Sequence, residues 1–361
     1  MSATQAPMPP RLASVDALRG ITVAAMLLVN NPGDWGHVYA PLRHADWHGC
    51  TPTDLIFPFF LFIVGVSIAL AILPRLEAGA ATAGLARSVW IRGAKIIAIG
   101  LLLHALAWWW LDQSGFRPWG VLQRIGLCFI AAGLLALHTR PRTQWLLAVL
   151  LLLGYWGVLA AGGTVAPWVN IASRVDTLLF APLLYQFDPI SGNGHDPEGL
   201  LSTLPSIATT VLGLRAGDWL RQGRSGRLLP MGVALLALGG LWSVWLPFNK
   251  QLWTSSYVLW SAGWAMLALW LCHALIDRRG WPALGRSFGV NAIAAYAGAA
   301  VMVYAFAGLG WWEPIYRWGF SAWMTPRFGP YLPSLAFALA FVLFWWLLVR
   351  WMDKRRWYLR V

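Results

Sequence analysis

The chain has 361 residues, of which 58% are hydrophobic and only 11% are charged, whereas a soluble domain carries about 25% charged residues. This composition excludes an ordinary soluble domain and indicates a membrane protein. The net charge of +13 does not predict nucleic-acid binding, because the basic residues fall in short clusters between apolar segments, as cytoplasmic loops do.

Ten apolar segments are each long enough, at about 20 residues, to cross the hydrocarbon core of a bilayer. They lack the period-two alternation of β-barrel strands. The sequence therefore predicts an all-α polytopic membrane protein with about ten transmembrane helices, at residues 14–33, 54–73, 93–111, 120–138, 144–162, 202–219, 229–247, 253–275, 287–309 and 332–352.

The predicted organisation is a cytoplasmic N-terminal tail at 1–13, one transmembrane domain at 14–352 and a basic cytoplasmic tail at 353–361. We expect no secretory signal before the first span, because residues 1–13 show no cleavage pattern. Of the 27 Lys and Arg residues, 18 fall in inner segments, 6 in outer segments and 3 within spans if the N-terminus is inside. This bias predicts that both termini are cytoplasmic.

The first predicted span carries polar residues at both ends. Asp16 and Arg19, at the inner end, are three residues apart and can pair on one helix face, either as a structural ion pair or in a functional role. Asn30 and Asn31 follow at the outer end. Side-chain amides such as theirs can stabilise a developing oxyanion.

The outer loop 34–53 and the start of the next span concentrate two histidines and two carboxylates, at His44, Asp46, His48 and Asp54. Polar groups near hydrocarbon are costly, so this concentration marks candidate chemistry. An imidazole can remove a proton near neutral pH or accept an acyl group; an ordinary interfacial histidine is the alternative. The residues alone do not separate His44 from His48. Asp54 suits a helix N-terminus or could orient a histidine ring.

The second long outer segment, at about 163–201, is rich in Gly, Pro and Asp and predicts turns and loops. Ser202 or Thr203 can then cap the helix that follows. Cys50, Cys128 and Cys272 are scattered, so we expect neither a metal site nor a disulfide framework.

Further polar residues lie near the ends of later spans. Gln123 and Arg124 begin the span 120–138, where Arg124 either snorkels to the interface or binds an anion. A turn rich in hydrogen-bonding groups, including Asn249, Lys250 and Trp253, precedes or begins the span 253–275. A capped helix start is the alternative to a functional role for this turn. Asn291 lies near the inner end of span 287–309 and could hold two helices together.

The basic clusters of the inner loops are best explained by topology and by binding of anionic membrane lipid. Some of these residues could instead hold the phosphates of a nucleotide-like cosubstrate. The sequence has neither a Walker-type loop nor a dinucleotide fingerprint.

In these motifs the chain resembles the heparan-α-glucosaminide N-acetyltransferase family of membrane acyltransferases, and the resemblance extends from about residue 11 over essentially the whole chain. The matching blocks are Ser14-Val15-Asp16-Ala17-Leu18-Arg19-Gly20, Val29-Asn30, His44-Ala45-Asp46-Trp47-His48-Gly49, Thr53-Asp54-Leu55-Ile56-Phe57-Pro58, Phe62-Ile63-Val64-Gly65, Gly120-Val121-Leu122-Gln123-Arg124-Ile125-Gly126, Asp196-Pro197-Glu198-Gly199-Leu200-Leu201-Ser202-Thr203-Leu204-Pro205, Asn249-Lys250-Gln251-Leu252-Trp253-Thr254 and Gly289-Val290-Asn291-Ala292-Ile293.

The resemblance implies transfer of an acetyl group from cytosolic acetyl-CoA to the amine of a glucosamine-type sugar on the far side of the membrane. It also implies that His44 is the active histidine, because His44 matches the histidine of the family's His-Ala-x-Trp block. We therefore expect catalysis by His44, Asn30 and Asp54. The remaining expected contacts are Asn31, Asp46, His48, Gln123, Arg124, Asn249, Lys250 and Trp253 for the acceptor, and Asp16, Arg19 and Asn291 for acetyl-CoA.

Two departures from the family pattern bear on the acceptor. His48 stands where the family commonly has an asparagine, and the chain does not show the N-terminal lumenal region of the animal lysosomal enzyme. We expect a multi-pass protein of the bacterial inner membrane, acting on an amino sugar or glycan; a homodimer is compatible with the sequence.

Two other functions fit the same residues. Intramembrane Asp, Arg and His would also suit a transporter of amino sugars, although the sequence lacks paired broken helices in two halves. An O-acetyltransferase of cell-envelope glycan would share the donor and the topology but prefer a hydroxyl acceptor.

Overall fold

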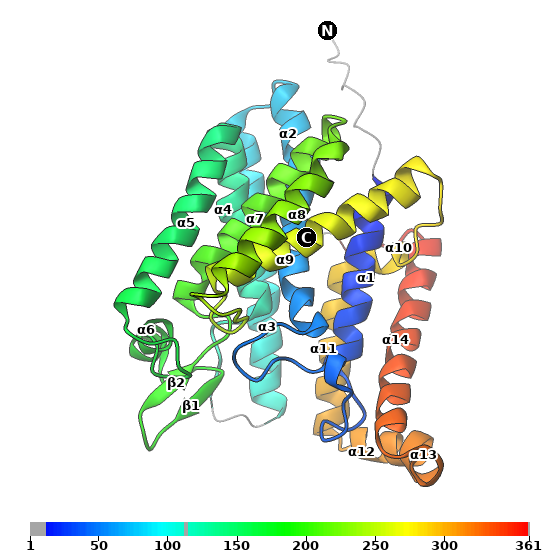
Figure 1. Ribbon diagram of the computed structural model, residues 1–361. Coiled ribbons are helices and arrows are strands. Elements are labelled where there is room, and N and C mark those ends of the chain that lie inside the picture. Colours follow the sequence, from blue (N-terminus) through cyan, green and yellow to red (C-terminus); the bar gives the residue numbers. More distant parts are fainter. Residues whose placement is uncertain (1–11, 112–114, 360–361) are drawn as a thin grey trace.

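The computed structural model describes residues 12–111 and 115–359, and long helices dominate it (Figure 1). The long helices are α1 (Ala13–Asn30), α2 (Ile56–Glu77), α3 (Thr82–Trp110), α4 (Val121–His138), α5 (Pro141–Ala161), α7 (Leu200–Arg221), α8 (Leu228–Trp242), α9 (Ser255–Cys272), α11 (Ala292–Gly308) and α14 (Tyr331–Lys354). The short elements are α6 (Ile171–Phe180), α10 (Arg286–Val290), α12 (Trp312–Tyr316), α13 (Ala322–Phe328) and the strands β1 (Gln186–Asp188) and β2 (Asn193–His195). The all-α polytopic fold is therefore confirmed.

Each of the ten predicted spans falls on one of the ten long helices, and most of these helices also meet the criteria of length and hydropathy for a span. Among the described residues, eight helices are long and apolar enough to cross a membrane. A ninth span results only if α11 is joined to the segment Trp312–Phe328, which is bent from it by 98°. The helix that does not qualify is α7.

The hydropathy of α7 is too low for this criterion because α7 is an interior helix. Seventeen of its 22 residues are buried, and they include Ser, Thr, Arg and Asp side chains. A helix surrounded by protein needs no apolar surface toward lipid. Its contact with α2 is close: an added Cβ at Gly213 would lie 1.9 Å from the backbone oxygen of Phe62.

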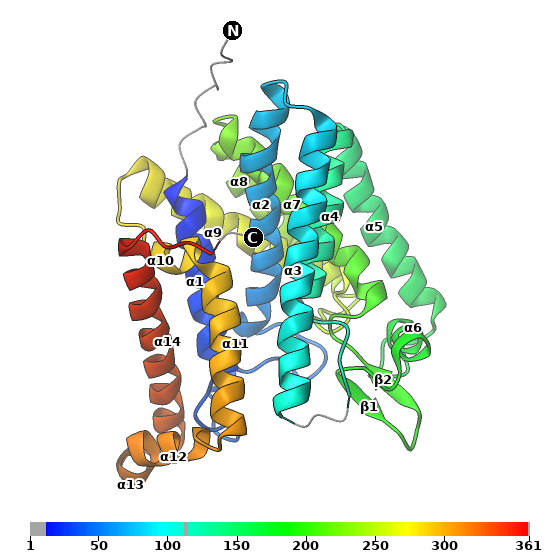
Figure 2. The ribbon, with the colours of Figure 1, turned by 180° about the vertical axis from the view of Figure 1, so that it is seen from behind.

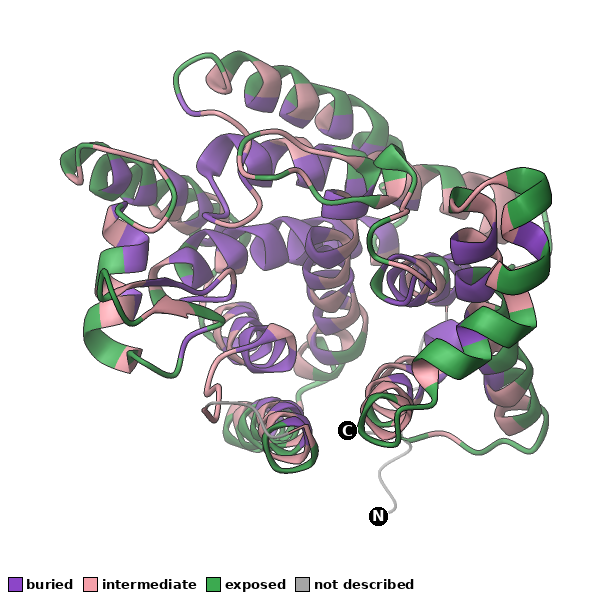
Figure 3. Ribbon diagram, turned by 90° about the horizontal axis from the view of Figure 1, so that it is seen from below, coloured by how far each residue is buried: buried purple, intermediate pink, exposed green. Residues whose placement is uncertain are grey.

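The helices form two groups with separate hydrophobic cores. α2 to α5 and α7 to α9 share the larger core, while α10, α11 and α14 share the smaller one, and α1 contributes to both, with Val15 and Leu18 in the larger core. The two groups stand side by side (Figure 2). Seen from the end that carries the β-hairpin, buried residues concentrate on the central helices and exposed residues on the periphery (Figure 3).

The second outer segment contains more regular structure than its turn-rich composition predicts. It folds into α6 and an antiparallel hairpin in which Gln186 pairs with His195. The predicted Ser or Thr cap on the following helix is wrong, because α7 begins at Leu200 and Ser202 and Thr203 already lie inside it. The backbone N–H of Leu200 donates instead to Asp176 of α6, at 2.8 Å, so a neighbouring helix supplies the partner.

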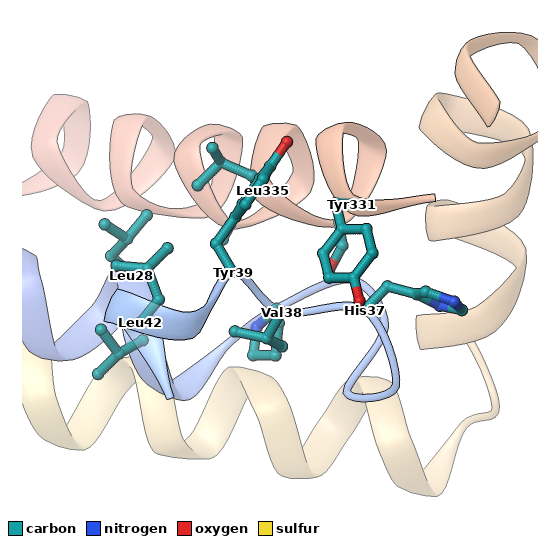
Figure 4. Close-up of a pocket in the computed structure, with 11 residues that line it drawn as sticks. Leu28, His37, Val38, Tyr39, Leu42, Tyr331 and Leu335 are labelled. Carbon is teal, nitrogen blue, oxygen red and sulfur yellow. The ribbon is translucent and has the colours of Figure 1, made fainter. Parts of the chain in front are cut away.

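The opening loop, residues 31–51, lies at the same end of the molecule as this hairpin (Figure 1). Its first half is fixed to α14. The backbone N–H of Asp34 donates to Ser334 Oγ at 3.0 Å, and the Asp34 carboxylate pairs with His37 at 2.7 Å. An apolar crevice between the loop and α14 is lined by residues that include Leu28, Val38, Tyr39, Leu42, Tyr331 and Leu335 (Figure 4).

Candidate active site

The second half of the opening loop is built around the Asp54 carboxylate. Thr51 and Asp54 form a capping box at the start of a 3₁₀ turn, Pro52–Leu55, that leads into α2. Asp54 Oδ2 accepts the backbone N–H groups of Thr51 at 2.9 Å and Ala45 at 3.1 Å. The carboxylate therefore fixes the loop on both sides of its turn.

The other oxygen of this carboxylate holds His44. Asp54 Oδ1 lies 2.7 Å from His44 Nδ1, and the Asp54 side chain is 1% exposed whereas that of His44 is 45% exposed. The contact assigns the proton of a neutral imidazole to Nδ1 and leaves the lone pair on Nε2. Asp54 thus combines the two roles considered for it, at a helix start and in orienting a histidine ring.

Lys250 brings a positive charge to the same ring. Its ammonium lies 3.3 Å from both Nδ1 and Nε2 of His44. Desolvation lowers the pKa of Lys250, while the charges of Glu198 and Asp54 oppose this lowering. The side chains of His44, Asp54 and Lys250 thus lie in contact with one another. We call this group the His44 cluster.

The turn that carries Lys250 is tied to the opening loop. The backbone N–H of Gly49 donates to the carbonyl of Phe248 at 2.8 Å, and Asn249 Nδ2 lies 3.5 Å from His48 Nδ1. Asn249 Oδ1 accepts the N–H of Leu252, so this amide also shapes the turn. Partial burial lowers the pKa of His48.

Trp253 and Arg124 pack together below this turn. Trp253 is fully buried, donates its indole N–H to Thr209 Oγ1 at 3.1 Å and lies under the Arg124 guanidinium, with the ring centre 5.2 Å from Cζ. Arg124 is 0% exposed, which rules out the alternative that it snorkels to the interface. Arg124 Nη2 donates to the Gly199 carbonyl at 3.1 Å and to Ser202.

Several buried polar atoms in this region lack a hydrogen-bond partner within the described part of the chain. They are Nε and Nη1 of Arg124 and Oε1 of Gln123. Buried polar groups are nearly always satisfied, so unpaired ones mark places where a ligand or water completes the bonding. Arg124 and Gln123 thereby stay candidates for substrate contact.

The two asparagines of α1 do not converge on His44. Asn31 is buried and donates to the carbonyl of Leu27, one turn back along α1, at 2.7 Å. Asn30 is exposed, and neither it nor Asp46, which is also exposed, forms a hydrogen bond with the His44 cluster. Their functional roles remain predictions.

The three expected acetyl-CoA contacts lie together at the other end of α1. Arg19 Nη1 lies 3.0 Å from Asp16 Oδ1 and donates to the Gly289 carbonyl, also at 3.0 Å. Asn291 follows two residues after Gly289, is 0% exposed, and has neither side-chain amide atom hydrogen-bonded to any described residue. The unpaired amide marks a place where a ligand or water completes the bonding.

Sequence reasoning missed a buried ionic group on the outer side. Arg117 forms two hydrogen bonds with Asp196, at 2.9 and 2.6 Å, and a third with Glu198 at 2.6 Å. Burial raises the pKa of Asp196, but the hydrogen bond and charge of Arg117 outweigh it and lower this pKa overall. The Asp-Pro-Glu-Gly motif was the available signal. Within residues 12–111 and 115–359, no three His, Cys, Asp or Glu side chains come together in a way that could hold a metal ion.

Comparison of the sequence with known proteins shows which family the chain belongs to. The model of the catalytic region of heparan-α-glucosaminide N-acetyltransferase matches residues 11–245. The chain belongs to this family. The matched region includes His44, Asp54 and Arg124, whereas Lys250 and Asn291 lie beyond it.

Two curated relatives carry the same name. The human heparan-α-glucosaminide N-acetyltransferase is 32% identical over 81% of this chain and 53% of its own length. The mouse protein is 28% identical over 81% of this chain and 54% of its own length. The chain thus spans about half the length of the curated relatives it matches.

Proposed function

We propose that the chain is an acetyltransferase that moves an acetyl group from cytosolic acetyl-CoA to the amine of a glucosamine-type sugar on the outer face of the membrane. The family and the names of the relatives support N-acetyl transfer. The observation that carries the proposal is the His44–Asp54 pair at 2.7 Å, because a carboxylate-oriented imidazole with an unprotonated Nε2 can act as a base or a nucleophile.

In direct transfer, the acceptor nitrogen attacks the thioester carbonyl and gives its proton to His44 Nε2. The C–N bond forms, the C–S bond breaks, and the thiolate of CoA leaves and takes up a proton. In the alternative, His44 Nε2 first accepts the acetyl group and then passes it to the amine. Either route moves only the acetyl group outward, so the charged donor never crosses the membrane.

Lys250 is placed to stabilise the negative charge that develops on the acetyl oxygen. Its ammonium is 3.3 Å from His44 Nε2, so an acetyl group reacting at this nitrogen lies within reach of that charge. A preorganised positive group at a developing oxyanion is commonly the largest contribution to catalysis. Asn30, the oxyanion donor that the resemblance implies, would have to act in addition to Lys250.

The inner side of the chain offers suitable groups for the donor. The unpaired amide of Asn291 suits the amide groups of a pantetheine arm, with Asp16 and Arg19 beside it. A basic groove on the inner half of α3 is suited to phosphates and is lined by Gly84, Arg87, Ser88, Ile91, Arg92 and Lys95. Anionic lipid would compete for this groove. We further propose a bacterial inner-membrane location with cytoplasmic termini, and a homodimer as the form to test first.

The test is product analysis with purified protein. Acetyl-CoA is supplied with glucosamine, with glucosamine oligomers and with sugars that carry only hydroxyl groups, and the products are identified by mass spectrometry. We expect N-acetylation by the wild type and none by His44→Ala, with an unchanged elution profile showing that the variant is folded.

Near-normal transfer by His44→Ala would contradict the assignment of the catalytic histidine. Acetylation of the hydroxyl-only sugars alone would show an O-acetyltransferase instead. Uptake of glucosamine into proteoliposomes without acetyl-CoA, together with no CoA release, would show a transporter.

A further inference from the structure

Trp47 lies where the two outer segments meet. Its indole N–H donates to the carbonyl of Val165 at 2.9 Å, so the opening loop is fixed to the second outer segment at this point. Two imidazoles stand against its ring: that of His195 at 5.2 Å and that of His48 at 6.3 Å between centroids, both at 68°. Trp47 is only partly buried, so part of its surface stays available for contact.

His195 is the most unusual member of this group. It ends β2, is 2% exposed, and its Nδ1 lies 2.8 Å from Ser173 Oγ. A side-chain hydrogen bond with Gln251 raises the pKa of His195 against the larger lowering by burial. Yet Nε2 makes no hydrogen bond of normal geometry with any residue in the described ranges. The imidazole is therefore fixed at Nδ1 and held at its other side only by the long contact with Gln251, so Nε2 keeps capacity for a further partner.

The chemistry around Trp47 suits an uncharged, hydroxyl-bearing ring. Burial lowers the pKa of both histidines, so they are neutral near pH 7, and a neutral imidazole offers one donor and one acceptor. The side chains of Asn249 and Gln251, in the turn beside them, are amides that both donate and accept. A sugar ring combines an apolar face, which packs on an aromatic ring, with hydroxyls that need such partners.

This group also lies within reach of the reacting nitrogen. Trp47 is three residues from His44, and three residues span at most about 11 Å. Gln251 is adjacent to Lys250, whose ammonium is 3.3 Å from the His44 ring. A monosaccharide lying on Trp47 can therefore direct one substituent toward His44 while its other groups face His195.

We propose that Trp47, His195 and Gln251 form the acceptor subsite, in which the sugar packs on the Trp47 indole and one of its hydroxyls bonds to His195 Nε2. This inference rests on the proposed function. It makes His195 a specificity-determining residue, which distinguishes an amino sugar from a simple amine, and it leaves the acetyl-transfer step to the His44 cluster.

The test compares glucosamine with cyclohexylamine, an amine on a six-membered ring without hydroxyls. In His195→Ala we expect kcat/KM for glucosamine to fall about tenfold, the typical effect of one lost hydrogen bond, with little change for cyclohexylamine or in the KM for acetyl-CoA. His195→Gln, whose amide can reach the position of Nε2, should restore part of the loss. His37→Ala is the matched control, because His37 lies in the opening loop but pairs with Asp34.

Calorimetric titration of glucosamine without acetyl-CoA separates this inference from the proposed function. Weaker binding to His195→Ala than to the wild type supports the subsite, even if the wild type transfers no acetyl group. Equal binding by both proteins overturns the subsite, even if transfer occurs. An equal loss of activity toward glucosamine and cyclohexylamine in His195→Ala and in His195→Gln also overturns it, because it indicates a purely structural role.

Discussion

His44 owes its orientation to a carboxylate ten residues further along the chain. The same carboxylate also holds the loop backbone at Ala45 and Thr51, so the ring and its support form one unit. The Asp54 carboxylate therefore supports both the His44 ring and the loop backbone. A replacement side chain that cannot accept all these hydrogen bonds disturbs the orientation of the ring and the conformation of the loop. The opening loop contains a second pair of the same kind, Asp34–His37, in the half of the loop that is attached to α14.

Asp54→Asn should lower kcat for acetyl transfer and should also weaken the attachment of the loop backbone. We expect a loss of at least about 100-fold in acetyl transfer, because an amide at this position no longer fixes the productive tautomer of His44. The measurement is kcat and the KM for acetyl-CoA in purified protein, with Asp34→Asn as the control. Equal effects of the two substitutions would show that the Asp54 carboxylate acts only on the loop.

Lys250 gives a second test at the same site. Lys250→Ala should reduce kcat by about 100-fold or more, as the loss of an oxyanion-stabilising group does, with little change in the KM for acetyl-CoA. Lys250→Arg, which keeps the charge, should retain part of the activity. Steady-state kinetics of both variants beside Lys95→Ala, a change in the basic inner groove, provides the comparison. A rise in the KM for glucosamine alone would instead place Lys250 in acceptor binding.

At this scale the sequence predicted the central residues but not all their neighbours. His44, Asp54 and Lys250 converge, although the last is about 200 positions away in the chain, because each belongs to a polar motif at the outer end of a span. Asn31 was misleading, since its amide bonds within its own helix. Trp47 and His195 were missed, because no local pattern indicates that a loop and a hairpin will pack together.

Among the elements, α7 shows how interior position changes composition. Arg215 donates to Gln144 of α5 at 2.9 Å and contacts Asp218, so its charge is paired within the bundle. Periodicity and length predicted the existence of this helix, but its hydropathy is that of a helix enclosed by others.

The contact between α2 and α7 predicts a large effect of one methyl group. Gly213→Ala would bring Cβ to 1.9 Å from the Phe62 carbonyl oxygen, and backbone atoms can yield only by moving a helix. We expect destabilisation of about 1–3 kcal/mol from overpacking, seen as a lower apparent Tm in detergent. Gly154→Ala in α5 is the control, because nothing lies within 4 Å of its added Cβ. An unchanged Tm in Gly213→Ala would contradict this packing.

For the whole molecule, the fold class and the helix order follow from hydropathy, and the orientation is predicted from the distribution of Lys and Arg. The grouping of the helices around two cores could not be predicted, because helix partners are chosen by side-chain fit and by small residues at the contacts. The two long outer segments lie at the same end of the molecule, as the predicted orientation of the spans requires. Their mutual packing does not follow from that orientation.

The orientation is testable by labelling of introduced cysteines. Ile190, in the hairpin, is 96% exposed and Leu284, in a predicted inner loop, is 71% exposed. In a background without Cys50, Cys128 and Cys272, a membrane-impermeant maleimide should label Ile190→Cys in cells with an intact inner membrane. Leu284→Cys should be labelled only after that membrane is opened. The opposite pattern would reverse the topology and place His44 in the cytoplasm.

The exposure of the His44 ring has a cost for the reaction proposed here. Nearly half of this side chain is open to the aqueous phase, so water competes with the acceptor for any acetyl group presented there. In the proposed reaction, hydrolysis would consume the thioester whenever the acceptor is scarce. An acceptor that covers the His44 ring as it binds would exclude water and suppress hydrolysis. The contact between the acceptor and the site would then both select the acceptor and protect the donor.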